Sequence, residues 1–86
     1  MQHLAKAIVE ALAFLELSGR DIVDPEAAVK TMEAMATTLQ SATPEERDAI
    51  IEAAMRELNK QSAADAPEEV LDFYEHLAAD LGLEEE

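Results

Sequence analysis

The sequence has 86 residues, with 20 Asp and Glu against 6 Lys and Arg, giving a net charge of −14. This length predicts a single domain over residues 1–86 with a modest hydrophobic core. The absence of cysteine excludes disulfide bonds, thiolate zinc sites and cysteine nucleophiles. The charge argues against binding of nucleic acid or an anionic membrane, because both require a basic surface. No segment is long enough and apolar enough to span a membrane, so we expect a cytoplasmic protein.

The composition favours helix almost throughout. Alanine has the highest helix propensity, and the sequence contains 17 alanines with only two Gly and three Pro. Strand patterns, in which β-branched or aromatic residues alternate with polar ones, are absent. The remaining large apolar residues recur at helical spacing in four segments.

The first predicted helix covers residues 2–18, and Gly19 stands where a C-terminal cap is expected. This segment is apolar around much of its circumference, which is typical of a central helix or of one with a second face for a partner. Val9, Phe14 and Leu17 lie off the face that we expect to point inward. That inward face is predicted to contain Leu4, Ile8, Ala11, Leu12 and Leu15.

The second predicted helix covers residues 25–40. Asp24 is a good N-cap residue, and Pro25 suits the first helical position. We expect Ile22 and Val23, just before this cap, to close the end of the core. The predicted inward residues are Val29, Met32, Ala36 and Leu39.

The third predicted helix covers residues 44–60 and has the clearest start signal. Thr43 and Glu46 have the spacing of a capping box, and Pro44 opens the helix. The expected inward residues are Ile50, Ile51, Ala54, Met55 and Leu58.

The fourth predicted helix covers residues 66–81, with Asp65 and Glu68 as a second possible capping box. Gly82 ends it, and residues 82–86 form an acidic tail. Short linkers between amphipathic helices predict antiparallel neighbours. The predicted fold is therefore all-α, a compact single-domain bundle of four antiparallel helices with short loops. The apolar face of the fourth helix contains Val70, Phe73, Tyr74, Leu77 and Leu81.

The residues required for catalysis or cofactor binding are missing from the pattern. His3 and His76 are the only histidines, and neither follows a Glu three residues earlier, as a di-metal bundle requires. No EF-hand loop or glycine-rich phosphate loop is present. An acyl carrier needs a modifiable serine at the start of its second helix, where this sequence has Asp24, Pro25 and Glu26. We therefore expect neither an enzyme nor a cofactor or metal site.

The acidic residues are distributed unevenly. All Lys and Arg residues occur by Lys60, and nine acidic residues without a base follow Gln61. This concentration favours a partner-binding surface over simple solvation, although cations from other helices or salt could also offset the charge. Glu16 and Asp21 form a second, smaller acidic patch. The candidate partner-binding residues are Asp65, Glu68, Glu69, Asp72, Glu75 and His76, together with Glu16 and Asp21.

Residues 14–47, FLELSGRDIVDPEAAVKTMEAMATTLQSATPEER, resemble the small acidic helical immunity proteins encoded beside bacterial toxins, including type VI secretion effectors. Such proteins generally cover the active site of a cognate toxin, often a basic nuclease. The resemblance implies a basic protein partner, a toxin or effector, whose cleft the acidic surface would fill.

Two other functions remain open. The broadly apolar first helix is compatible with a homo-oligomeric structural or adapter protein, including a homodimer. An inhibitor that mimics nucleic-acid phosphates would use the same acidic surface against a DNA-binding protein.

Overall fold

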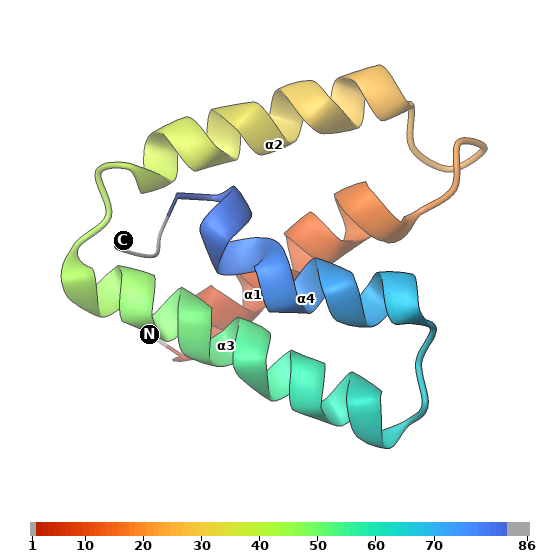
Figure 1. Cartoon of the computed structure of the whole chain (residues 1–86). Helices are drawn as coiled ribbons and strands as arrows, with labels where there is room; N and C mark the ends of the chain where they lie inside the picture. The colour runs from red at the N-terminus through yellow and green to blue at the C-terminus, as the bar shows by residue number, and fades with distance from the viewer. Residues whose placement is uncertain (1, 83–86) are drawn as a thin grey trace.

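The computed structural model describes residues 2–82 and contains four helices (Figure 1). Successive helices run in opposite directions, and no strand occurs in this range, which confirms the predicted all-α bundle of four helices. Residues 83–86 of the predicted acidic tail lie outside the described part of the chain. The helices are α1 (Gln2–Leu17), α2 (Pro25–Leu39), α3 (Pro44–Ala63) and α4 (Glu68–Asp80).

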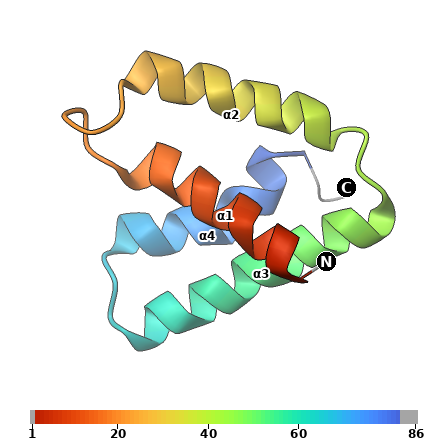
Figure 2. The same cartoon turned by 180° about the vertical axis from the view of Figure 1, so that it is seen from behind.

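The four helices do not contribute equally to the packing. Helix α3 packs extensively against α4 and α1, whereas α2 packs mainly on α1 (Figure 2). The radius of gyration is 12.6 Å, close to the value of about 12 Å expected for a compact chain of this length. The molecule is thus a compact core of three helices with α2 laid on one side.

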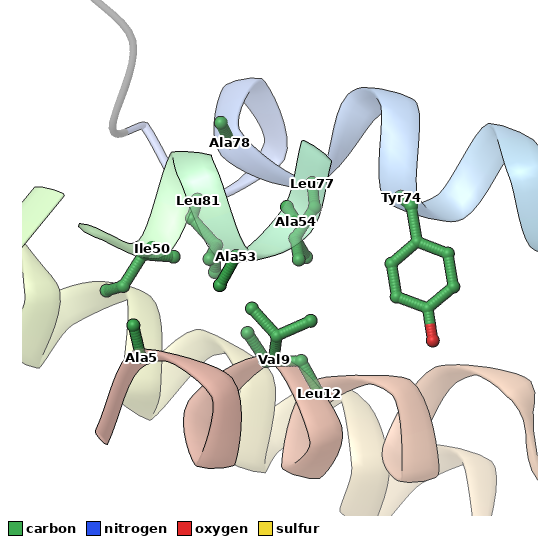
Figure 3. Packing of buried hydrophobic residues seen from close by; sticks show 10 residues of the cluster. All are labelled: Ala5, Val9, Leu12, Ile50, Ala53, Ala54, Tyr74, Leu77, Ala78 and Leu81. Carbon is green, nitrogen blue, oxygen red and sulfur yellow. The ribbon is translucent and has the colours of Figure 1, made fainter. Parts of the chain in front are cut away.

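The core is built from small and medium-sized residues of α1, α3 and α4 (Figure 3). Leu12 and Leu77 are the largest side chains that are fully buried. Alanines at the contacts allow the helix backbones to approach closely. The buried cluster consists of Ala5, Val9, Leu12, Ile50, Ala53, Ala54, Tyr74, Leu77, Ala78 and Leu81.

The inward face of α1 differs from the predicted one. Leu4 is 71% exposed, whereas Val9, expected to lie off the face, is 2% exposed. The buried face contains Ala5, Val9 and Leu12. The small Ala5 side chain faces Ile50 of α3 in the buried cluster (Figure 3), so the two helices can pack closely there.

Three other residues expected in the core are also exposed. Val29 of α2 is 55% exposed, Met55 of α3 is 58% exposed, and Ile22 before α2 is 66% exposed. Helix α2 buries only Ala28 fully. Met32, Met35 and Leu39 are half-buried because α2 covers α1 without entering the contact between α3 and α4.

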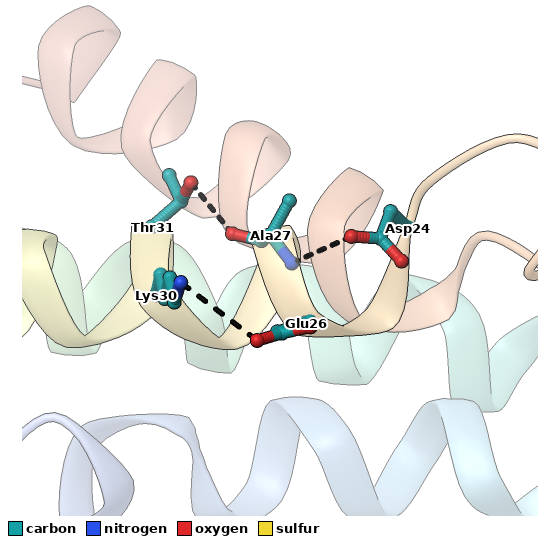
Figure 4. A network of polar contacts seen from close by, with 5 residues as sticks. All are labelled: Asp24, Glu26, Ala27, Lys30 and Thr31. Carbon is teal, nitrogen blue, oxygen red and sulfur yellow. Dashed lines mark hydrogen bonds and ion pairs between the residues drawn. The ribbon is translucent and has the colours of Figure 1, made fainter.

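The predicted starts of α2 and α3 are confirmed. The Asp24 carboxylate accepts a hydrogen bond of 3.2 Å from the backbone N–H of Ala27 (Figure 4). In the same turn Lys30 lies 3.8 Å from Glu26, and the Thr31 hydroxyl donates to the Ala27 carbonyl oxygen. The capping box at the start of α3 is also formed.

The boundary between α3 and α4 was predicted wrongly. Helix α3 continues to Ala63, beyond residue 60, and α4 begins at Glu68, after residue 66. The expected capping box of Asp65 and Glu68 does not form, because Pro67 occupies the N-cap position and no side chain caps the helix. Asp65 instead turns the chain with a φ of 56°.

The two glycines at helix ends also behave differently. Gly82 has a φ of 71° and follows α4 as expected for a C-terminal cap. Gly19 does not adopt this left-handed conformation. Its carbonyl oxygen accepts hydrogen bonds from the N–H groups of Ile22 and Val23, so it starts the turn toward α2.

Candidate functional site

Helix α4 carries the main group of acidic residues on its outer side. Its buried side contains Tyr74, Leu77 and Ala78. At about 100° per residue, the exposed acids cover an arc of about 140° on the opposite side. No Lys or Arg occurs in α4. We call this surface the α4 acidic face, and it consists of Glu68, Glu69, Asp72, Glu75 and Asp80.

His76 is exposed within the α4 acidic face. Its Nδ1 donates a hydrogen bond of 3.0 Å to the carbonyl oxygen of Asp72, one helical turn earlier. This hydrogen bond raises the pKa of His76, and the charges of Glu75, Asp72 and Asp80 raise it further, while partial desolvation opposes them. The imidazole is therefore the one group of this face that can add a positive charge near neutral pH.

The remaining candidate residues lie around this face or away from it. Asp65 is exposed in the turn between α3 and α4. Asp21 is exposed in the loop after α1, and Glu16 is exposed in the last turn of α1. The tertiary structure brings Glu16 together with Asp80, because both line one surface hollow.

This hollow has a volume of about 260 Å³ and lies between α1, α2 and α4. Three carboxylates border an otherwise apolar floor, so it has the chemistry to hold a cation carried on an aliphatic stem. Glu33 of α2 was not predicted from the sequence, because it carries no local signal of a site. The lining consists of Glu16, Glu33 and Asp80 with Val29, Met32, Ala36, Phe73, Leu77 and Leu81.

The titratable group most buried in the core is Tyr74. Its ring meets Phe73 edge-on, with centroids 4.9 Å apart and planes at 72°. Burial raises the pKa of Tyr74, and the negative charges of Glu57 and Glu10 raise it further. The phenol is thus kept neutral, and it serves the packing of α4.

Residues 2–82 contain neither a cluster of metal ligands nor a membrane-spanning helix. No group of three or more His, Asp and Glu side chains is placed to hold a metal ion there. None of the four described helices is long and apolar enough to cross a membrane. Comparisons with family models, curated proteins and solved structures found no match for the chain.

Proposed function

We propose that this chain is a non-catalytic binding protein that engages a basic protein partner through the α4 acidic face. The observation that carries the proposal is the concentration of exposed carboxylates on one helix that has no Lys or Arg. Like charges spaced three or four residues apart repel one another in the free protein. A positively charged partner relieves this repulsion and gains complementary contacts.

The hollow beside Asp80 supports the same proposal. A Lys or Arg side chain of the partner can lay its methylene groups on Met32 and Phe73 while its charged end meets the carboxylates at the border. Such an anchor combines apolar burial with charge pairing, whereas the rest of the acidic face steers the approach of the partner.

The resemblance of residues 14–47 to immunity proteins specifies the partner further. Under this proposal the chain neutralises a cognate bacterial toxin by covering its basic active-site cleft. Association steered by charge is fast at low salt and slows as salt screens the two surfaces.

The test begins with the genes adjacent to the gene for this chain. Each neighbour is expressed alone and together with this chain in a bacterial host. We expect one neighbour, with a basic surface, to arrest growth alone and to be neutralised by co-expression. If no neighbour arrests growth, or if none binds this chain, the immunity function is wrong.

A charge reversal then locates the binding surface. The variant Asp72→Lys/Glu75→Lys reverses two exposed carboxylates of the α4 acidic face and should abolish protection. The matched variant Asp48→Lys/Glu52→Lys changes the net charge equally on α3 and should retain it. Equal protection by both variants would show that the partner binds elsewhere.

A homo-oligomeric protein remains a second candidate, because several large apolar side chains are exposed. Leu4, Phe14 and Ile22 are 71%, 56% and 66% exposed. Light scattering coupled to size-exclusion chromatography distinguishes the two functions. A stable dimer that Leu4→Ser or Phe14→Ser dissociates would favour the oligomer, whereas a monomer would exclude it.

A further inference from the structure

A groove between α1 and α3 has the opposite charge to the α4 acidic face. It has a volume of about 370 Å³ and lies between the first two turns of α1 and the second half of α3. Half of the six Lys and Arg residues of the sequence line it. The lining residues are Gln2, His3, Lys6, Ala53, Arg56, Glu57 and Lys60.

Lys6, Arg56 and Lys60 form no ion pair with another described residue. The ion pair found in residues 2–82 is Lys30 with Glu26, which lies on α2. Glu10 and Glu52 stand four residues from Lys6 and Arg56, but neither carboxylate comes within 4.0 Å of them. The positive charges are thus available to a ligand.

Glu57 is the one carboxylate that lines the groove. Its Oε1 accepts a hydrogen bond of 3.1 Å from Gln61 Nε2, on the same helix. Lys6, Arg56 and Lys60 outnumber this single negative charge, which leaves a local surplus of two positive charges. The ligand that balances the groove therefore carries at least two negative charges.

The start of α1 adds to this positive potential. Its first turn contains no acidic residue, and Gln2 and His3 of that turn line the groove. The N-terminal end of a helix carries a partial positive charge and free N–H groups, which favour anions. The first turn and the three side-chain cations thus act on the same space.

The size and charge of the groove select among possible anions. A volume of about 370 Å³ falls at the lower end of the range for small-molecule sites, about 300–1,000 Å³. An acidic protein is a poorer ligand: a second copy of this chain brings a net charge of −14, which repels the first. A single carboxylate would leave the surplus partly unbalanced.

We propose that this groove binds a diphosphate group, as found in inorganic pyrophosphate and in nucleoside diphosphates. Arg56 pairs with one phosphate through two parallel N–H donors, as the planar guanidinium allows. Lys6 and Lys60, on the two walls of the groove, bind the bridging and outer oxygens as point charges.

The test is a titration of the full chain, labelled with ¹⁵N, with inorganic pyrophosphate and separately with ADP. Ionic strength is held constant so that screening does not change. We expect saturable shifts of the backbone amide signals of residues 2–6 and 53–60 below about 10 mM ligand. If pyrophosphate binds and ADP does not, the site recognises the free anion. If ADP binds more tightly than pyrophosphate, the site recognises a nucleotide.

Paired variants separate the groove from general charge effects. Lys6→Gln/Arg56→Gln should weaken pyrophosphate binding by about tenfold or more, because charge-assisted hydrogen bonds are lost. Arg20→Gln/Lys30→Gln removes the same charge outside the groove and should change binding by less than about twofold. Glu57→Gln removes the opposing carboxylate and should strengthen binding by about threefold.

Three results would overturn the proposal. They are the absence of a saturable response up to about 10 mM pyrophosphate, equal weakening in both double variants, and shifts centred away from α1 and α3. Because the altered side chains of Lys6 and Arg56 are exposed, circular dichroism should show unchanged helix content. A dimer that dissociates in Lys6→Gln/Arg56→Gln without any ligand would assign the groove to a second copy.

Discussion

Thr43 and Glu46 satisfy each other's backbone groups at the start of α3. The Thr43 hydroxyl accepts a hydrogen bond of 3.1 Å from the N–H of Glu46, and the Glu46 carboxylate accepts one of 2.8 Å from the N–H of Thr43. This reciprocal pair fixes the point at which the chain turns from α2 into α3. Arg47 reinforces it by donating from Nη2 to the Gln40 carbonyl oxygen, at 2.9 Å.

We expect Thr43→Ala to lower the free energy of unfolding by about 1 kcal/mol, because an N–H group of the first turn loses its acceptor. Urea unfolding followed by circular dichroism measures the change. Thr38→Ala, at an exposed position within α2, is the matched control and should change stability by less than about 0.5 kcal/mol. Equal effects of the two substitutions would contradict a capping role.

The packing of α1 predicts a sharp contrast between two leucines eight residues apart. Leu12 is completely buried, and Leu4 is 71% exposed. Leu12→Ala should cost about 3 kcal/mol through lost burial and a cavity, whereas Leu4→Ala should cost less than about 0.5 kcal/mol. Urea midpoints at constant m-value check both changes. A larger cost for Leu4→Ala would mean that α1 buries the face expected from sequence.

His76 should make stability depend on pH. Its pKa is raised in the folded protein above the ordinary value of 6.5. Its protonation therefore stabilises the fold fully below pH 6.5, and this contribution disappears as pH rises through the raised folded pKa. The difference in unfolding free energy between the wild type and His76→Gln should be larger at about pH 5.5 than at about pH 8.

An NMR titration of the His76 ring signals tests the cause directly. Glu75→Gln removes a nearby negative charge and should lower the pKa of His76, whereas Glu45→Gln on α3 should leave it unchanged. A pKa of His76 at or below 6.5 in the wild type would contradict the prediction.

The two glycines offer a matched test of backbone conformation. Gly82 has a φ of 71°, and a Cβ atom there would lie 3.2 Å from Gln40 Nε2. Gly82→Ala should destabilise the protein by about 1 kcal/mol because alanine is strained at this φ. Gly19 does not have a left-handed backbone, so Gly19→Ala should destabilise the protein less than Gly82→Ala. The added Cβ atom would meet only the movable side chain of exposed Asp21. Thermal unfolding of both variants gives the comparison.

The sequence alone determined the parts of this protein that depend on near neighbours. The caps at Asp24 and Thr43 join residues three positions apart, so their spacing is visible without a fold. The α4 acidic face was equally visible, because a regular helix with one apolar side must turn its acids outward. The Asp65 cap failed for a local reason as well: Pro67 moved the start of α4 by two residues.

The tertiary structure decided everything that depends on which helices meet. Helix α1 is apolar around much of its circumference, so its own pattern could not select between Leu4 and Val9, and the packing of α1 against α3 made the choice. The same holds for the groove between α1 and α3 and for the hollow beside Asp80. Lys6 and Arg56 are fifty residues apart in the sequence, and Glu33 and Asp80 belong to different helices, so their charges act on a common space only after the bundle has packed.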